Sequence, residues 1–378
     1  MSNNKHFADL MKVCSVLPVF AVMPAMASAL DSQLVIDSSE TLKLSNMNVS
    51  GMAADTNGGA IVSAGVLSVS DAEFIGNSSK GYGGVAYLRN DDGTTSLNIS
   101  GTKLSTNSAS IGGALFGHTN ASITLNNTDF EYNTAEFGGA VYTATSSGVF
   151  TMNGGKVNAN TAWSAGGLDL FATSFLNYVT FTNNKATNAD DDGAGALFLG
   201  SVSKTYITDS EFRGNTSAAV GGAIAMRSAD EGNNSKAKLD IFDSEFINNH
   251  ADTNGGAIYS TFYDSATVKD SVYIYDTDFT LNSANNGGAI YTEGLPDLGS
   301  GLASMKIVDA DFDGNTATNF GGAIYNGGNL ILSDGDFENN EAGDGGAIFN
   351  KGVLTVNGGS EFIRNTAELA GGAIYNGL

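Results

Sequence analysis

A glycine-led unit recurs along this chain at nearly regular intervals. It first appears as Gly58-Gly59-Ala60-Ile61 and is found at twelve places, with a mean spacing of about 28 residues. A unit of this length can bury its apolar side only against its neighbours, so the repeat predicts a solenoid. The other units start at Gly83, Gly112, Gly138, Gly166, Ala194, Gly221, Gly255, Gly287, Gly321, Gly345 and Gly371.

A second motif lies eight or nine residues before most of these glycines. It consists of a large apolar residue, two variable residues and an asparagine, and it occurs eleven times without a missing asparagine. The apolar residues are Phe74, Leu104, Phe130, Val157, Phe181, Phe212, Phe246, Phe279, Phe312, Phe337 and Phe362. The asparagines are Asn77, Asn107, Asn133, Asn160, Asn184, Asn215, Asn249, Asn282, Asn315, Asn340 and Asn365.

Short alternating stretches such as Ile123-Thr124-Leu125 and Leu330-Ile331-Leu332 connect the two motifs. This alternation is the period of a β-strand, and no helical periodicity accompanies it. The sequence therefore predicts an all-β chain, a right-handed single-stranded parallel β-helix of the pectin-lyase-like kind with about twelve coils. Successive coils should lie about 4.8 Å apart.

Stacking assigns a role to each recurring residue. The phenylalanines are expected to form an aromatic stack inside the coils. The asparagines are expected to form an amide ladder at a turn, since Asn tolerates the left-handed conformation and its amide both donates and accepts hydrogen bonds. The glycine pair should allow a corner with positive φ and a close approach of adjacent chains.

The combination of GGA-I/L/V and F-x-x-N repeats closely resembles the passenger region of the Chlamydia-type polymorphic outer-membrane proteins, and more broadly β-helical autotransporter passengers. The resemblance extends over roughly Gly58 to Leu378. It implies a right-handed β-helix displayed outside a Gram-negative cell, often with an adhesive role, and followed by a C-terminal β-barrel. This chain departs from that pattern because no barrel segment is visible in it.

The first 29 residues differ from the rest. Lys5 and Lys12 precede an apolar run from Val13 to Met26, and Ala27-Ser28-Ala29 supplies the small-residue cleavage pattern of a secretory signal peptide. Cys14, the single cysteine, would leave with this peptide. The chain is thus expected to divide into a signal peptide (1–29), an N-terminal cap or first incomplete coil (30–57) and the β-helix repeats (58–378), which are expected to be truncated at the C-terminus.

Charge narrows the range of partners. Removal of the signal peptide changes the formal net charge from −23 to −24, which disfavours nucleic acid and anionic lipid as ligands. No later segment has enough uninterrupted apolar residues for a spanning helix. We expect an exported protein at the cell surface, in the outer membrane or outside the cell. Its expected partner is a protein or glycan on a host or neighbouring cell.

The last residues, Asn376-Gly377-Leu378, directly follow the twelfth glycine unit. A solenoid needs a cap over its last coil, and none is visible. The prediction is a truncated portion of a longer product, anchored to the outer membrane through a missing barrel. The alternative is a short secreted protein that associates end to end.

A secreted polysaccharide-cleaving β-helix enzyme is the rival interpretation, because this scaffold also carries such enzymes. It would need several carboxylates converging from adjacent coils, with Ca²⁺ or a basic residue nearby. Asp190-Asp191-Asp192 is interpreted as a solvated turn, with a weak Ca²⁺ site as the minor alternative. Asp91-Asp92-Gly93 reads as a hairpin turn.

No catalytic, cofactor-binding or metal-binding residue is predicted. His118 and His250 lack the spacing of a metal pair, and Trp163 is expected to pack rather than to bind. The carboxylates before many phenylalanines are interpreted as an outward, like-charged stripe. They are Glu73, Asp129, Glu211, Glu245, Asp278, Asp311, Asp336 and Glu361.

Three coils are longer than the others between the glycine unit and the next phenylalanine. The extra residues are Arg227 to Lys238, Thr261 to Asp270 and Glu293 to Ser304, and they should form a platform of stacked loops. Binding residues concentrate on loops held by rigid scaffolds. We therefore expect a non-enzymatic, surface-displayed passenger with a structural and adhesive role, and any recognition is expected at this platform.

Overall fold

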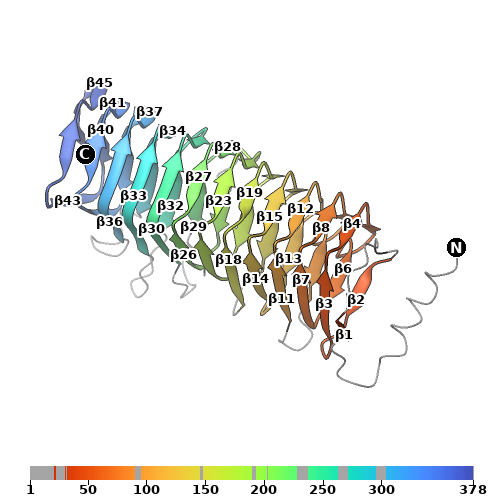
Figure 1. Cartoon of the computed structure of the whole chain (residues 1–378). Helices are drawn as coiled ribbons and strands as arrows, with labels where there is room; N and C mark the ends of the chain where they lie inside the picture. The colour runs from red at the N-terminus through yellow and green to blue at the C-terminus, as the bar shows by residue number, and fades with distance from the viewer. Residues whose placement is uncertain are drawn as a thin grey trace.

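The computed structural model is a rod in which the chain winds through parallel strands from one end to the other (Figure 1). It describes residues 21–22, 30, 32–89, 95–144, 148–189, 193–201, 203–227, 237–262, 271–294 and 304–377. Among these residues there is no helix, and the strands stack as a β-solenoid of about 11 turns. The predicted all-β parallel solenoid is therefore confirmed.

A 13-stranded sheet follows the glycine units along one side of the rod. Its strands are β2 (Leu34–Ile36), β6 (Ile61–Ser63), β10 (Ala86–Leu88), β13 (Leu115–Gly117), β17 (Val141–Thr143), β21 (Leu168–Leu170), β25 (Leu197–Leu199), β29 (Ile224–Arg227), β32 (Ile258–Phe262), β35 (Ile290–Gly294), β38 (Ile324–Gly327), β42 (Ile348–Asn350) and β46 (Ile374–Asn376).

A 22-stranded sheet bends across the next two sides. Its first column contains β1 (Ala21–Val22), β3 (Thr41–Ser45), β7 (Val66–Ser70), β11 (Ser96–Ser100), β14 (Ser122–Asn126), β18 (Val149–Asn153), β22 (Thr173–Asn177), β26 (Lys204–Thr208), β39 (Asn329–Ser333) and β43 (Val353–Asn357). Its second column contains β4 (Asn48–Ser50), β8 (Glu73–Ile75), β12 (Lys103–Ser105), β15 (Asp129–Glu131), β19 (Lys156–Asn158), β23 (Thr180–Thr182), β27 (Glu211–Arg213), β40 (Asp336–Glu338) and β44 (Glu361–Ile363). Three long strands span both columns, namely β30 (Lys238–Ile247), β33 (Ser271–Thr280) and β36 (Ser304–Asp313).

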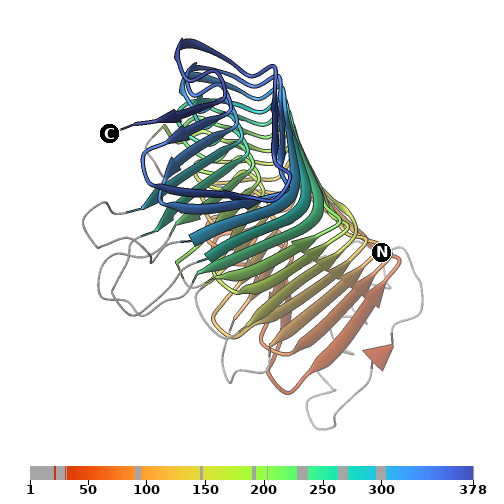
Figure 2. The same ribbon diagram turned by 90° about the vertical axis from the view of Figure 1, so that its left-hand side faces the viewer.

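Short strands close each coil after the asparagine turn (Figure 2). The 9-stranded sheet contains β16 (Thr134–Ala135), β20 (Thr161–Ala162), β24 (Lys185–Ala186), β28 (Thr216–Ser217), β31 (His250–Ala251), β34 (Ser283–Asn286), β37 (Thr316–Phe320), β41 (Glu341–Asp344) and β45 (Thr366–Ala370). A 2-stranded sheet of β5 (Ala53–Ala54) and β9 (Ser78–Ser79) continues it toward the N-terminus.

Phenylalanines fill the interior, as the sequence predicts. Seven of them form a continuous stack from Phe181 to Phe362, with ring centroids 4.5 to 4.9 Å apart and interplanar angles of 2 to 9°. Six of the seven side chains are fully buried, and Phe362 packs partly buried against the core. Offset or stacked aromatic pairs add roughly 0.5 to 1.5 kcal/mol each to the stability that burial provides.

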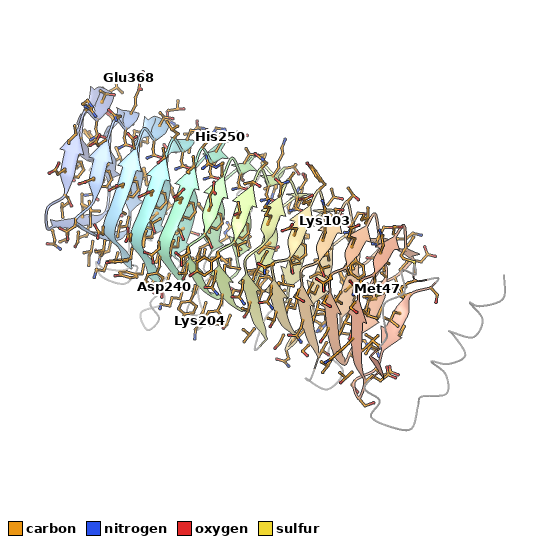
Figure 3. The ribbon with its side chains drawn as sticks, viewed as in Figure 1. Met47, Lys103, Lys204, Asp240, His250 and Glu368 are labelled. Carbon is orange, nitrogen blue, oxygen red and sulfur yellow. The ribbon has the colours of Figure 1, made fainter. Side chains whose placement is uncertain are left out.

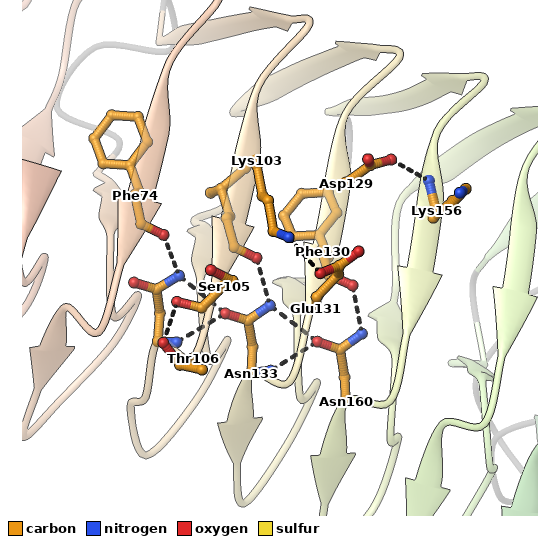
Figure 4. A network of polar contacts seen from close by, with 12 residues as sticks. Phe74, Lys103, Ser105, Thr106, Asp129, Phe130, Glu131, Asn133, Lys156 and Asn160 are labelled. Carbon is orange, nitrogen blue, oxygen red and sulfur yellow. Dashed lines mark hydrogen bonds and ion pairs between the residues drawn. The ribbon is translucent and has the colours of Figure 1, made fainter. Parts of the chain in front are cut away.

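The asparagines form a continuous amide ladder (Figure 4). In each step Nδ2 of one asparagine donates to Oδ1 of the next, as between Asn107 and Asn133 at 2.9 Å. Nδ2 also donates to the carbonyl of the apolar residue one coil earlier, as from Asn133 to Leu104 at 3.0 Å. These contacts satisfy both the donors and the acceptor of a buried amide.

The ladder asparagines were expected to tolerate the left-handed conformation at a turn, and this reason for their recurrence was wrong. None of the eleven ladder asparagines, all of which are described, has a positive φ. The left-handed residue is the one before each of them, because that residue turns outward while the asparagine must point inward. The left-handed residues are Gly76, Thr106, Tyr132, Ala159, Asn183, Gly214, Asn248, Leu281, Gly314, Asn339 and Arg364.

The two glycines of each unit are required for different structural reasons. The first has a positive φ, as at Gly255 (66°), whereas a Cβ on the second, Gly256, would lie 2.1 Å from the carbonyl oxygen of Gly288. In one coil the predicted start at Gly166 was one residue too late. Ala165 pairs with Ala194 there, and Gly166 is the second residue of its unit. Alanine avoids positive φ, and neither of these two alanines has it.

Candidate functional site

Several predicted features fall largely outside the described residues. These are the turns Asp190-Asp191-Asp192 and Asp91-Asp92-Gly93 and most of each long insertion. The residues flanking the insertions are described, and they lie in register. Where the insertions begin, Arg227 pairs with Thr261, and Thr261 pairs with Glu293. Where they end, Lys238, Ser271 and Ser304 pair in turn. The three insertions thus leave and rejoin the rod at the same corner of successive coils.

The carboxylates before the phenylalanines lie on the outer face of the 22-stranded sheet, as expected. Glu245, Asp278 and Asp311 pair with one another from coil to coil. A second acidic column, which the sequence reading missed, occupies the bend of the same sheet three residues before the five consecutive phenylalanines from Phe212 to Phe337. It consists of Asp209, Asp243, Asp276, Asp309 and Asp334, all with positive φ.

Like-charged neighbours affect ionisation along these columns. Partial burial raises the pKa of Asp278, and the charges of Glu245 and Asp276 raise it further. Partial burial likewise raises the pKa of Asp311, with added contributions from Asp278 and Asp336. The columns extend over the surface of many coils and do not converge on one point.

The described residues offer no geometry for a metal centre. Among them, no group of three or more His, Cys, Asp or Glu side chains is arranged to hold a metal ion. His250 contacts Ser283 Oγ at 2.8 Å and Asp252 Oδ1 at 3.1 Å, while His118 lies beside aromatic rings on a distant coil. Trp163, 43% exposed, packs edge-on against Phe137 at 5.6 Å.

A shallow depression of about 280 Å³ lies over β3, β7, β11 and β14. Its lining is made of hydroxyl, amide and aliphatic groups and one amine, and it includes no aspartate or glutamate. The residues are Lys43, Leu44, Ser45, Ser68, Val69, Ser70, Asn98, Ile99, Ser100 and Asn126. This composition lacks the paired carboxylates that glycoside hydrolysis requires.

The outer side of the 13-stranded sheet carries a second aromatic column. Tyr259, Tyr291 and Tyr325 stack with centroids 5.5 and 4.5 Å apart, and the column continues through Phe349 and Tyr375. Tyr259 and Tyr291 are only 6% and 7% exposed, so their ring faces are occupied by one another. The repeated tyrosine of GGAIY was the sequence signal for this column. The tyrosine recurs because it occupies the same outward strand position in successive coils, where each ring stacks on the next.

One rung of this column holds a carboxylate. Asp169 on β21 pairs with Tyr142 on one side and Phe198 on the other. It is 2% exposed, and its Oδ1 has no hydrogen-bond partner. Burial raises the pKa of Asp169 to about 8, so the acid remains largely protonated at neutral pH.

A different surface combines partly exposed rings with lysines on β22, β26, β30, β33 and β36. Phe175 stacks on Tyr206 at 5.2 Å, Phe242 meets Tyr273 edge-on at 5.8 Å, and Lys306 Nζ lies 5.5 Å from the centre of the Tyr273 ring. We call this surface the aromatic–lysine patch. It consists of Phe175, Tyr206, Phe242, Tyr273, Tyr275, Lys204, Lys238, Lys306 and Asp240.

Asp240 lies in the middle of the aromatic–lysine patch, beside Lys204 on the same side of the rod (Figure 3). It is 6% exposed, and it pairs with Tyr206 on one side and Tyr273 on the other. Its Oδ2 accepts a hydrogen bond from Lys238, which raises the pKa of that lysine. Its Oδ1 is buried without a partner. Sequence reasoning missed this group because outward residues differ from coil to coil.

The fold and its columns define a repetitive parallel β-solenoid. Four segments match the family model described as the Chlamydia polymorphic membrane protein repeat, at residues 243–261, 276–293, 309–327 and 334–351. Each starts at a bend aspartate and ends just past a glycine unit. These coils are thus similar to the repeats of that family, which confirms the predicted resemblance. No curated protein and no solved structure matches the chain.

Proposed function

We propose that the chain is an exported, surface-displayed passenger of the polymorphic membrane protein or autotransporter kind, with a structural and adhesive role and no catalytic centre. The observation that carries the proposal is the match of four coils to the polymorphic membrane protein repeat. The matched segments contain the phenylalanine, the asparagine and the glycine pair that build the solenoid. The family is named for membrane proteins, which supports a location at the outer membrane or cell surface.

The repeated outer face of the rod supports an adhesive role. The surface depression over β3 to β14 has no carboxylate in its lining. Among the described residues, no helix is long and apolar enough to cross a bilayer. A rod that repeats its outer face from coil to coil can present several copies of a weak contact, and several weak contacts acting together give firm attachment.

Surface display is tested in a Gram-negative host that expresses the gene. Intact cells should lose the protein after treatment with an external protease, and antibodies should label them without permeabilisation. A variant without residues 1–29 is the matched control and should be protected inside the cell. Protection of the full chain would argue against display.

Adhesion is tested with the purified protein on cultured cells. The coil that starts at Gly321 gives a template for shortening the insertions, because there Gly328 alone connects the two sheet positions. Replacing residues 228–237, 262–270 and 294–303 by one glycine each should leave the far-ultraviolet circular dichroism unchanged and reduce cell binding. Equal cell binding after all three replacements would exclude the platform formed by the three insertions as the binding site. Cleavage of polysaccharide by the unmodified protein would favour an enzyme instead.

A further inference from the structure

His250 lies between a hydroxyl group and a carboxylate on the outer surface of the 9-stranded sheet (Figure 3). Its Nδ1 is 2.8 Å from Oγ of Ser283, and its Nε2 is 3.1 Å from Oδ1 of Asp252. His118, the other histidine after residue 29, instead lies beside aromatic rings. Ser283, His250 and Asp252 thus connect a nucleophile, a base and a carboxylate, which is the chain of contacts in a nucleophilic triad.

The positions of the protons in this triad follow from its partners. The carboxylate of Asp252 only accepts hydrogen bonds, so Nε2 of His250 carries the hydrogen of that contact. In the neutral imidazole Nδ1 is then left as the acceptor, and the hydroxyl of Ser283 donates to it. His250 is therefore oriented to remove the proton of Ser283, and Asp252 holds the ring in the tautomer that does so.

The solenoid fixes the three residues relative to one another. Ser283 on β34 pairs with His250 on β31, and Asp252 follows His250 by two residues, so the side chains of His250 and Asp252 point to the same side. The side-chain amide of Asn285 donates to the backbone carbonyl of Asp252 at 2.6 Å and holds this segment against the next coil. The base and the nucleophile therefore need no ordering step before a reagent arrives.

The backbone around Ser283 limits which reagents react there. The N–H of Ser283 donates to the carbonyl of Asn249, and that of Asn285 donates to the carbonyl of Thr253, both at 3.0 Å. These two amides are not free to stabilise an oxyanion, which is usually the largest contribution to catalysis in a hydrolase. The side chain of His250 is 49% exposed, so water is not excluded either. Only an acyl donor with a good leaving group is expected to react at such a site.

We propose that Ser283 is an acylation site that takes up one acyl group from an activated ester. Oγ of Ser283 attacks the acyl carbon, a new C–O bond forms, and the bond from that carbon to the oxygen of the leaving group breaks. The hydroxyl proton passes to Nδ1 of His250 and then to the departing oxyanion. The product is an alkyl ester of serine, which persists because its own leaving group is strongly basic. This modification goes beyond the proposed adhesive function and does not depend on it.

The purified full-length chain is incubated with p-nitrophenyl acetate, whose leaving group is a weakly basic phenolate. We expect Ser283 to be acetylated about a hundredfold faster than Ser68, because a positioned general base contributes a factor of this size. Ser68 is also half-buried on a strand, but it pairs with Lys43 and Asn98. Peptide mapping by tandem mass spectrometry locates the acetyl groups and measures both rates.

The amount of nitrophenolate that is released separates acylation from hydrolysis. The unmodified protein should release one equivalent more than Ser283→Ala and then stop. This difference removes the contribution of other nucleophiles, which Ser283→Ala retains. Ethyl acetate, whose leaving group is strongly basic, should not acetylate Ser283.

Variants of the triad assign a role to each neighbour of Ser283. His250→Gln should lower the acetylation rate of Ser283 by about a hundredfold, because glutamine does not take up the proton. Asp252→Asn should lower it by about tenfold or more, and Asp252→Glu, which keeps the carboxylate, should recover most of the rate. Thr216→Ala is the matched control, because Thr216 pairs with His250 on its other side and should leave the rate unchanged.

An acetyl group absent from Ser283, equal acetylation rates at Ser283 and Ser68, or an unchanged rate in His250→Gln would overturn the inference. Equal rates in Asp252→Asn and Asp252→Glu would overturn the positioning role of Asp252. Release of nitrophenolate that continues beyond one equivalent and requires Ser283 would overturn the inference too, because it would show a hydrolase rather than an acyl acceptor. These assays contain no cells, so a negative result would leave the adhesive function untouched.

Discussion

The side-chain amide of Asn282 donates a hydrogen bond of 3.0 Å to Oδ1 of Asn315, which lies beside it on the next coil. The same oxygen accepts the backbone N–H of Asn282 at 3.0 Å. Nδ2 of Asn315 in turn donates to the carbonyl of Phe279 at 2.8 Å and to Oδ1 of Asn340 at 3.0 Å. Both asparagines are fully buried. Each of these two amides thus connects three coils.

Asn315→Ala should lower the free energy of unfolding by roughly 2 to 4 kcal/mol, because it leaves donors on Asn282 and the carbonyl of Phe279 buried without partners. Urea denaturation followed by circular dichroism measures the change. Thr318→Ala, at an exposed position on the following strand, is the control and should have no measurable effect. A similar loss of unfolding free energy in both variants would contradict the expectation that the amide ladder stabilises the fold.

The internal columns could be predicted from the sequence because each demands one residue type in every coil. Only phenylalanine and similar apolar groups fill the interior, and only asparagine satisfies the amide ladder. The left-handed position before the asparagine could not be recognised, since Tyr132, Leu281 and Arg364 all occupy it. The exposed side chain there has few contacts to restrict its type. At Gly166 the predicted register failed by one residue, because Ala165 replaces the usual first glycine.

The aromatic–lysine patch could not be predicted for a different reason. Its residues alternate with core residues along strands, and the strands follow insertions of unequal length. Phe175 and Lys306 are far apart in the sequence and come together only through the pairing of β22, β26, β30, β33 and β36. The residue types at outward positions also change from coil to coil, so no sequence repeat indicates which of them form the patch.

Leu281→Gly should stabilise the protein by about 1 kcal/mol, since Leu281 is held at a φ of 56° with 57% of its surface exposed. A residue with a Cβ is strained in the left-handed region, and glycine is not. Thermal unfolding provides the measurement. The reverse change one coil later, Gly314→Leu, should lower the melting temperature, because Gly314 has a φ of 64°. A lower melting temperature for Leu281→Gly would show that packing of the leucine outweighs its strain.

Gly288→Ala should lower the free energy of unfolding by more than about 4 kcal/mol. A Cβ at this position would lie 2.0 Å from the carbonyl oxygen of Gly322 and 2.6 Å from that of Thr316, and both belong to the backbone of the next coil. Relief requires separation of two coils that share hydrogen bonds. Gly359→Ala is the control, because its nearest neighbour would be a side-chain oxygen of Asp334 at 3.7 Å. Limited proteolysis should cut the Gly288 variant near the affected coils and leave the control intact.

Asp169→Asn should remove a pH dependence of stability. Burial raises the pKa of Asp169 to about 8 in the folded state, whereas an unfolded aspartate titrates near 3.9. Between these values the folded chain binds one proton more than the unfolded chain, so stability falls as pH rises from about 4 to about 8 and is then constant. The slope for one such group is at most about 1.4 kcal/mol per pH unit. Asparagine resembles the protonated acid in shape and does not ionise.

The variant should therefore equal the unmodified protein near pH 4 and exceed it in stability at pH 7 and pH 8. Urea midpoints measured between pH 4 and pH 9 check this expectation. Asp71→Asn, at an exposed bend position where asparagine also tolerates the φ of 52°, is the control for a change of charge alone. If the urea midpoints of the two variants differ from that of the unmodified protein by the same amount at every pH, then Asp169 is ionised in the folded state and the aromatic column accommodates its charge.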